Sequence, residues 1–328
     1  MKLRHLRTAT LIALLLVSSF ASQISVAQKF TLAILPDTQG EVNQKPEMLS
    51  SQLQWIVDKK DSLNIPFVLH VGDIVDFDNV GHWKTASDCF KLLDNAKMPY
   101  VLCLGNHDTE AVGENSGSAA SDVPGATHLN LRKTTKFNTY FPPIRLLGQK
   151  GQFEVGKSDN AWYTFQAGGL DWLVVSLEFC ARKEPVEWAG KVVSNHPNHN
   201  VIILTHYHLN GNGEICENNA GYGDLSPYAI YDMLIKKHPN ILMVHSGHTG
   251  SSTWRNDRGD NGNRIYQILT DYQHENFGNG YLRLLEVDPA KRTLTGKVYS
   301  PYNGIEKCEA LIRFTGVKFI APKVAQFL

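Results

Sequence analysis

The chain has 328 residues, with 32 basic and 32 acidic side chains and therefore a formal net charge of zero. This balance argues against a broad basic surface for nucleic acid, although it leaves the binding of a single nucleotide open. The hydrophobic content of 42% is enough to bury a sizeable core at this length. Five cysteines at irregular spacing fit neither a disulfide scaffold nor a Cys-X-X-Cys metal clip.

The first 27 residues are typical of a secretory signal peptide. Lys2, Arg4 and Arg7 form a basic start, residues 11–17 are all apolar, and small residues at 25–27 precede a cleavage position. An uncleaved anchor is the alternative, but an apolar stretch of seven residues is too short for a stable membrane span. We therefore expect a periplasmic or secreted protein whose residues 28–328 form a single domain.

The segment from residue 30 to residue 104 alternates apolar strands with amphipathic helices. Strands are expected at 30–35, 67–71 and 100–104, and helices at 46–63 and 82–96. Such alternation indicates βαβ units and a buried parallel sheet. The stretch 110–127, which is rich in Gly, Ala and Ser, is expected to be a long loop.

The second half of the chain continues with both kinds of element. A hairpin is expected at 161–165 and 170–177, helices at 185–194 and 227–238, and further core strands at 201–204 and 241–244. From Arg264 onward the pattern is that of strands only. We predict an α/β fold, a two-layer β-sandwich of mixed sheets flanked by helices, in which strands from about 264–328 complete the second sheet.

A polar side chain follows each of the five predicted core strands. In chain order these are Asp37, Asp73, Asn106 with His107, His206 and His248. One strand-end Asp is more typical of a cap or turn, and Asp37-Thr38-Gln39 taken alone favours a turn. Ligands of α/β sheets bind beyond the carboxyl ends of the strands, however, and this joint set of oxygen and imidazole donors suits two divalent metals.

The motifs that carry these residues resemble those of the calcineurin-like metallophosphoesterases. The segments "PDTQ", "VGDIVD", "GNHD", "LTHYH" and "SGHTG" follow in the family's order between residues 37 and 250. "FNTYFPP", "GGLDWLVVSLEF" and "GNGYLRLLEVDP" resemble a secreted bacterial branch that carries "LPDTQ". The resemblance implies an α/β/β/α fold and hydrolysis of phosphomonoesters or phosphodiesters by in-line attack of a metal-bound hydroxide.

The resemblance also implies roles for the donors. Asp73 would bridge two metal ions, Asp37 would hold the first ion, and the second ion would be held by Asn106, His206 and His248. The ions expected are Mn²⁺, Fe or Zn²⁺, and the substrate is a small-molecule or nucleotide phosphoester.

The catalytic pair implied by the resemblance is His107 with Asp108. His107 would contact the phosphate and protonate the leaving oxygen, and Asp108 would orient its imidazole. Two departures from the family pattern concern the first metal: Gln39 and Gly250 stand where the family has histidines. A Gln oxygen binds hard cations but is weaker than imidazole for zinc or iron, so the first site is expected to be weakened.

Other histidines and a late glutamine complete the candidates. His208 and Gln273 could contact substrate or replace a missing ligand, whereas His70 and His245 lie in apolar runs and favour a core position. Two alternative functions stay open. The first is a mononuclear or metal-poor protein of the same fold that binds phosphate or nucleotide with weak catalysis. The second, a surface interaction or carbohydrate-binding module, would not explain the strand-end donors.

Overall fold

The computed structural model describes residues 28–115 and 127–322. The predicted signal peptide at 1–27 and residues 116–126 of the predicted loop lie outside the described residues. Within the described ranges, no helix combines the length and apolar character that crossing a membrane requires. The five cysteines are free thiols.

The first sheet contains the three N-terminal strands and the last four strands of the described chain. Its order is β13-β12-β11-β1-β2-β3, and β14 also pairs with β12. The strands are β1 (Phe30–Leu35), β2 (Val68–His70), β3 (Tyr100–Leu102), β11 (Leu282–Asp288), β12 (Thr293–Ser300), β13 (Ile305–Glu306) and β14 (Ile312–Thr315). β1, β2 and β3 are parallel, which confirms the predicted βαβ units, whereas β11 runs antiparallel to β1.

The second sheet is built from the middle of the chain. Its order is β4-β5-β6-β7-β8-β10-β9. The strands are β4 (Gln149–Gln152), β5 (Ala161–Ala167), β6 (Leu170–Ser176), β7 (Asn200–Leu204), β8 (Ile241–Ser246), β9 (Trp254–Arg258) and β10 (Arg264–Leu269). β5 and β6 form the predicted hairpin, and β6, β7, β8 and β10 are parallel. The carboxyl ends of these four strands therefore meet at one edge.

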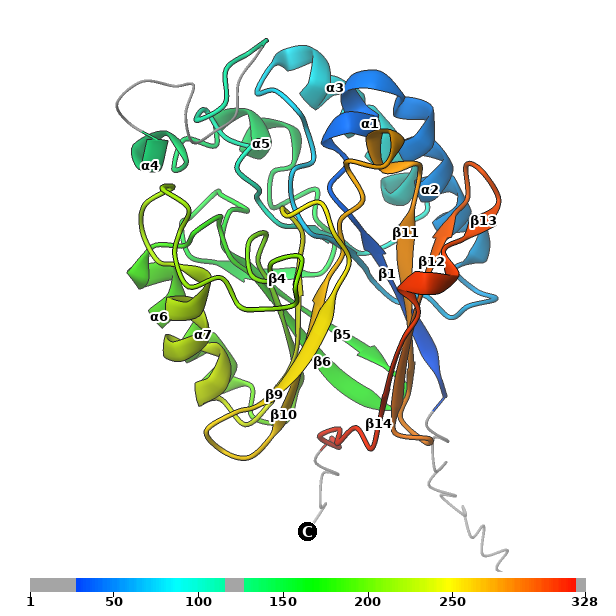
Figure 1. The fold of residues 1–328 in the computed structure, drawn as a ribbon, viewed down its shortest axis with the longest axis vertical. Coiled ribbons are helices and arrows are strands. Elements are labelled where there is room, and N and C mark those ends of the chain that lie inside the picture. The colour runs from blue at the N-terminus through cyan, green and yellow to red at the C-terminus, as the bar shows by residue number, and fades with distance from the viewer. Residues whose placement is uncertain (1–27, 116–126, 323–328) are drawn as a thin grey trace, which may run out of the picture.

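Helices cover the outer faces of the two sheets, as Figure 1 shows. The helices are α1 (Gln39–Gln44), α2 (Pro46–Lys59), α3 (Val80–Asn95), α4 (Thr127–Asn130), α5 (Thr135–Tyr140), α6 (Lys183–Asn195) and α7 (Pro227–Met233), with single turns η1 (Ile235–Lys237), η2 (Asn276–Gly278) and η3 (Cys308–Ala310). α2 and α3 pack on the first sheet, and α6 and α7 on the second. The fold is thus the predicted α/β/β/α arrangement.

The amphipathic pattern of α2 explains its place. Pro46 begins the helix, where a missing N–H costs nothing, and a stripe of apolar side chains at helical spacing is buried on the first sheet. The helix ends at Lys59, four residues before the predicted boundary at 63. The predicted helix 227–238 is likewise divided, into α7 and η1.

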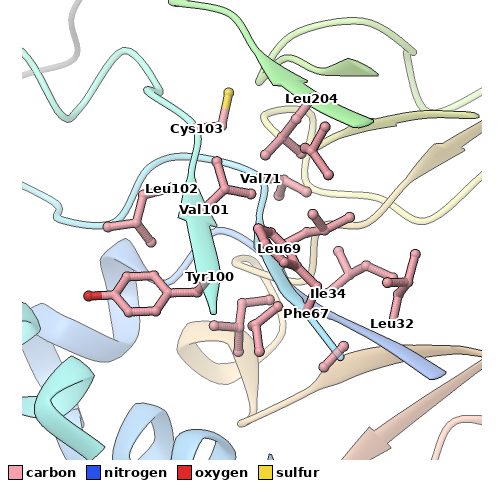
Figure 2. Packing of buried hydrophobic residues seen from close by; sticks show 14 of the residues in the cluster. Leu32, Ile34, Phe67, Leu69, Val71, Tyr100, Val101, Leu102, Cys103 and Leu204 are labelled. Carbon is pink, nitrogen blue, oxygen red and sulfur yellow. The ribbon is translucent and has the colours of Figure 1, made fainter. Parts of the chain in front are cut away.

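The main core lies between the sheets and under α2 and α3. Figure 2 shows how β3 contributes to both sides: Tyr100 and Leu102 point one way, and Val101 points the other, toward Leu204 of the second sheet. All four side chains are essentially buried. A strand buried on both faces is expected to be apolar throughout, which is why β3 shows no polar alternation.

The C-terminal strands divide between the sheets, so the expectation that they complete only the second sheet is wrong. β10 joins the second sheet beside β8, whereas β11, β12, β13 and β14 extend the first sheet beyond β1. The sequence pattern correctly predicted strands in this part of the chain. The pattern does not specify, however, which neighbouring strand each of them pairs with. That partner is fixed by which apolar face each strand buries against the opposite sheet.

Candidate metal centre

The predicted donors meet at the carboxyl ends of strands from both sheets, and not at the edge of a single sheet. Asp37, Asp73 and Asn106 follow β1, β2 and β3, whereas His206 and His248 follow β7 and β8. The His206 Nε2 lies 3.1 Å from the Asp73 Oδ2, which joins the two sheets directly. The stacking of the sheets thus brings together side chains that are up to 211 residues apart.

Asp73, His206 and His248 form the tightest group of potential metal ligands in the described chain. One ligand atom from each lies within 4.8 Å of the others. The His206 Nδ1 lies 2.8 Å from the backbone oxygen of Val71, which orients the ring with Nε2 toward Asp73. A second hydrogen bond of this kind is typical of metal-ligating histidines.

The electrostatics of this group suit a cation. Burial alone would raise the pKa of Asp73, but His206 and His107 outweigh it and hold the pKa below its ordinary value. Burial, followed by the charge of His206, lowers the pKa of His248 to about 3. Burial would lower the pKa of His206, but the Asp73 carboxylate outweighs it and raises the pKa. Asp73 and His248 therefore offer an ionised carboxylate and a neutral imidazole, the states in which both side chains bind metal.

Unpaired buried acceptors show that the remaining donors also fit a metal. The Asp37 Oδ1, the Gln39 Oε1 and the Asn106 Oδ1 are buried and accept no hydrogen bond from the part of the chain that the structure describes. Such atoms destabilise a fold unless a cation or a donor compensates them. The residue types present thus match a metal centre on the grounds of structure as well as motif.

Two motif glycines make room for the carboxylates. A Cβ added to Gly105 would overlap the Asp73 Oδ1, and a Cβ added to Gly247 would overlap the Asp37 Oδ1. The Asp37 Oδ2 also accepts a hydrogen bond from the His248 N–H, at 3.0 Å. Close approach of side-chain oxygens to the backbone explains the glycines in "GNHD" and "SGH".

Three aromatic rings pack around the imidazole of His248. The ring centroids of Tyr207, Phe179 and Tyr222 lie 4.7, 5.2 and 5.6 Å from that of its imidazole. His248 itself has a φ of 78°, an uncommon value for a residue with a side chain. Packing on three sides holds the ring in place despite this conformation.

His107 lies beside the potential metal ligand Asp73. Its backbone N–H donates to the Asp73 Oδ1 at 2.9 Å. Its Nδ1 lies 2.6 Å from the backbone oxygen of Asp76 and 3.6 Å from the Asp76 Oδ1. Asp76 was not among the predicted site residues. It is the last residue of "VGDIVD", the motif that carries Asp73, so its position in the sequence could have indicated a place near the site.

The predicted role of Asp108, orienting the His107 imidazole, is wrong in this structure. Its carboxylate is fully buried and accepts from the N–H groups of Ile74, Val75 and Gly105 at 2.8 to 3.1 Å. These bonds hold the loops after β2 and β3 together. Asp108 is therefore a structural support of the site, and Asp76 is the group that faces the imidazole.

Gln39 and Gln273, which were candidates for different roles, lie in contact with one another. The Gln39 Nε2 donates to the Gln273 Oε1, and the Gln273 Nε2 lies 3.4 Å from the backbone oxygen of His248. Gly250 has a φ of +66°, and the imidazole of His274 occupies the space that its side chain would need. A histidine at position 250 would therefore adopt an unfavourable positive φ and would displace the exposed His274 side chain.

His208 and His70 lie outside the donor group. The His208 Nε2 contacts the Gln267 Oε1 at 2.5 Å, and none of its hydrogen bonds within the described ranges reaches Asp37, Asp73 or His248. The structure therefore does not support His208 as the substitute ligand. His70 contacts Thr38 and the Gly72 N–H through its two ring nitrogens, as expected of a satisfied core histidine.

Asp271 is a second acidic residue that sequence reasoning missed. It follows β10, is buried, and accepts a hydrogen bond from the Gly250 N–H. The Gly250 N–H lies two residues after the His248 N–H that donates to Asp37, which places Asp271 beside the donor group. The signal was present in the sequence: "RIYQILTD" is another apolar strand that ends in an Asp.

Comparison with known proteins agrees with this geometry. Residues 30–252 match the family model described as calcineurin-like phosphoesterase. The chain is 30% identical over 285 residues to the uncharacterized protein YvnB of Bacillus subtilis, covering 83% of this chain and 20% of that protein. The chain thus spans about a fifth of the length of this relative.

Solved structures share the fold at low identity. A dimetal phosphatase from Danio rerio aligns with 87% of this chain and 98% of its own, with a TM-score of 0.51 and 12% identity. The purple acid phosphatase PPD1 from yellow lupin aligns with 89% of this chain and 54% of its own, with a TM-score of 0.54 and 14% identity. These matches establish the two-sheet fold flanked by helices.

Proposed function

The chain belongs to the calcineurin-like phosphoesterase family, and from this premise we propose that it is a metal-dependent hydrolase of phosphomonoesters or phosphodiesters. The observation that carries the proposal is the buried donor group at the carboxyl ends of both sheets. Asp73, His206 and His248 converge there, and three further acceptors lack partners among the described residues. A fold without a ligand at this place would bury these groups at a cost.

The donors divide between two proposed sites. Asp73 would be shared, Asn106, His206 and His248 would hold the second cation, and Asp37 with Gln39 would contribute to the first. Two divalent cations at such a centre supply charge neutralisation and an activated water for in-line displacement at phosphorus. Mn²⁺, Fe or Zn²⁺ would suit the second site because imidazole nitrogens favour them.

His107 is the proposed proton donor for the leaving oxygen. Its backbone is fixed on Asp73 and its Nδ1 on the Asp76 backbone, so the opposite nitrogen, Nε2, is the one available to a substrate. The Asp76 Oδ1 lies 3.6 Å from the same Nδ1 and would help to orient the ring. General acid catalysis of this kind is worth roughly 10²- to 10⁴-fold.

A second candidate function is a mononuclear, weakly catalytic protein that binds phosphate or nucleotide. Gln39 and Gly250, which replace histidines of the family pattern, favour this reading because both concern the first site. We also propose that the protein is exported to the periplasm or secreted. That proposal is supported by the basic and apolar pattern of residues 1–27.

The deciding experiment combines metal analysis with a substrate panel on one preparation. We expect about two ions per chain after reconstitution with Mn²⁺, and hydrolysis of p-nitrophenyl phosphate or bis-p-nitrophenyl phosphate. His107→Ala is expected to lower kcat at least about 100-fold. The matched control is His238→Ala, whose imidazole lies beside Gly190 of α6, away from the donors.

The outcomes separate the two functions. A content near one ion per chain, with phosphate binding but negligible turnover, would favour the mononuclear candidate. Hydrolysis that is unchanged in His107→Ala would rule out the proposed role of this histidine.

A further inference from the structure

We propose that Asp271 completes the first metal site, which makes this site an all-oxygen site selective for a hard cation such as Mn²⁺ or Mg²⁺. The inference rests on the proposed metal-dependent function and deepens it. It also gives a reason for the loss of both first-site histidines from the motif. They were replaced by a carboxylate from a different strand.

The position of Asp271 matches that of the other donors. Asp37, His206 and His248 each stand two residues beyond the last residue of their strands, β1, β7 and β8. Asp271 stands two residues beyond Leu269, the end of β10. β10 is parallel to β8, with Leu269 opposite Ser246, so Asp271 and His248 reach the same level of the sheet.

The carboxylate of Asp271 is buried without a basic partner. Its Oδ1 accepts from the Gln273 N–H at 3.0 Å and its Oδ2 from the Gly250 N–H. No lysine or arginine within residues 28–115 and 127–322 forms an ion pair with it. The Asp37 Oδ2 accepts from the His248 N–H at 3.0 Å, so the two carboxylates bond backbone N–H groups two residues apart on one loop. Two neighbouring buried carboxylates favour a cation between them.

Unpaired oxygens beside Asp271 point to the same cation. The Asp37 Oδ1 belongs to a fully buried side chain and has no donor among the described residues, and neither has the Gln39 Oε1. Gln39 also bonds Gln273, whose Nε2 lies 3.3 Å from the Asp271 Oδ2. The amide N–H groups of Gln39 and Gln273 are thus used by the Gln273 Oε1 and the Asp271 Oδ2, whereas the Asp37 Oδ1 and the Gln39 Oε1 stay available to a cation.

The backbone at Gly250 shows how the replacement works. A side chain at this position would adopt an unfavourable positive φ and would displace the imidazole of His274. The Gly250 N–H instead donates to Asp271, so the carboxylate lies against the very residue whose side chain is missing. The substitution at 250 and the carboxylate at 271 are therefore two parts of one rearrangement.

A buried arginine holds the loop that carries Asp271. The Arg283 side chain contacts the Thr270 Oγ1 and the Tyr272 hydroxyl, each at 3.1 Å, on either side of Asp271. It also donates to the Ser252 Oγ and to the backbone oxygen of Ala310. The guanidinium is fully buried, and these neutral acceptors fix both flanks of Asp271 before any ligand binds.

The chemistry of the donors predicts the metal preference. Asp37, Asp73, Asp271 and Gln39 offer carboxylate and amide oxygens only, and such sets favour Mg²⁺ or Mn²⁺ over Zn²⁺. The second site, with His206 and His248, keeps imidazole nitrogens and the opposite preference. The centre would therefore hold two different metals when both are supplied.

The test is Mn²⁺ binding by the full chain. Calorimetry measures the number of ions bound and their affinities, and electron paramagnetic resonance detects whether two bound ions are coupled. Wild type should bind two ions, with the spectrum of a coupled pair. Asp271→Asn, which keeps size but removes charge, should weaken one of the two sites at least about tenfold and abolish the coupled signal. Asp159→Asn is the matched control, since Asp159 is equally buried but bonds Thr134 and Asn138 instead.

A second variant tests the all-oxygen character. Gln39→His restores an imidazole to the first site and should raise its affinity for Zn²⁺ relative to Mn²⁺ at least about tenfold. Two ions bound equally by wild type and Asp271→Asn would overturn the inference but leave the proposed function standing. One ion bound by wild type would overturn both.

Discussion

At the scale of single residues, Asp76 and Asp108 have the same side chain but different roles. Both are acidic residues close to His107, one in "VGDIVD" and the other in "GNHD". The Asp108 oxygens are used by three backbone N–H groups, whereas the Asp76 Oδ1 faces the His107 imidazole. Hydrogen-bond capacity, and not nearness in sequence, assigns their roles.

This assignment predicts opposite phenotypes for two isosteric variants. Asp76→Asn removes the charge beside His107 but keeps its backbone contact, so kcat should fall about tenfold with little change in KM. Asp76→Glu should recover part of the loss because it restores the charge. Both are measured as steady-state kinetics on the better of the two p-nitrophenyl esters.

The companion variant is Asp108→Asn, in which an amide N–H₂ would face one of three backbone donors. The expected result is a loss of about 1–3 kcal/mol in the free energy of unfolding, measured by urea titration. A stable Asp108→Asn protein with reduced kcat, alongside an active Asp76→Asn protein, would restore the original assignment of Asp108 to His107.

At the scale of elements, Glu178 joins segments that the sheets do not connect. It follows β6 and accepts from Asn160 at 2.9 Å and from the Arg182 Nε at 2.8 Å, and it forms an ion pair with the Arg132 Nη1 at 3.0 Å. Arg132 follows α4 and Arg182 precedes α6. One buried carboxylate thereby ties two helical segments to the edge of the second sheet.

The ionisation of Glu178 predicts an acid-sensitive contribution to stability. Burial alone would raise the pKa of Glu178, but the bonds from Arg182 and the charge of Arg132 outweigh it and lower the pKa. A lowered folded-state pKa stabilises the fold above the unfolded value of about 4.3, and this stabilisation is lost as pH falls through the folded value.

Glu178→Gln should therefore unfold more easily than wild type by about 1–3 kcal/mol near pH 7, and the difference should shrink below about pH 4. Urea titrations at both pH values measure it. Glu187→Gln on the outer side of α6 is the control, because its ion pair with Lys183 is exposed and worth little. A difference that persists at acid pH would mean that packing, and not charge, is responsible.

At the scale of the whole molecule, the candidate metal centre is where the two sheets are joined by polar contacts. Asp37 and Asp73 come from the first sheet, and His206, His248 and Asp271 from the second. Like charges and unpaired acceptors on this boundary oppose the packing that the apolar core favours. A bound cation would remove that opposition, so ligation and sheet packing should be coupled.

Metal removal is thus expected to lower thermal stability. At a free ion concentration about 100 times Kd, each site adds about 2.7 kcal/mol, which corresponds to a Tm shift of roughly 5–10 °C. Differential scanning calorimetry with Mn²⁺ and with excess chelator measures the shift. Asp73→Asn is the control, since Asn tolerates the positive φ of 51° at this position but removes the bridging charge. A chelator effect of the same size in that variant would place the stabilising ion elsewhere.

The sequence by itself determined the chemistry of most strand ends. Asp37, Asp73, Asn106 and His206 were identified because each follows a short apolar run, and periodicity and local composition are enough to show that pattern. The same local signals established the βαβ units, the hairpin at Gly168-Gly169 and the motif resemblance. All of these depend on neighbours within about twenty residues.

Only the tertiary structure decided which distant groups meet. β11 pairs with β1, Asp76 in place of Asp108 faces His107, and Asp271 accepts a hydrogen bond from the Gly250 N–H in the loop after β8. Each of these contacts depends on how two twisted sheets stack and on which loop has free hydrogen-bond capacity. Local sequence carries no information on either, because packing free energy is shared among side chains from every element of the core.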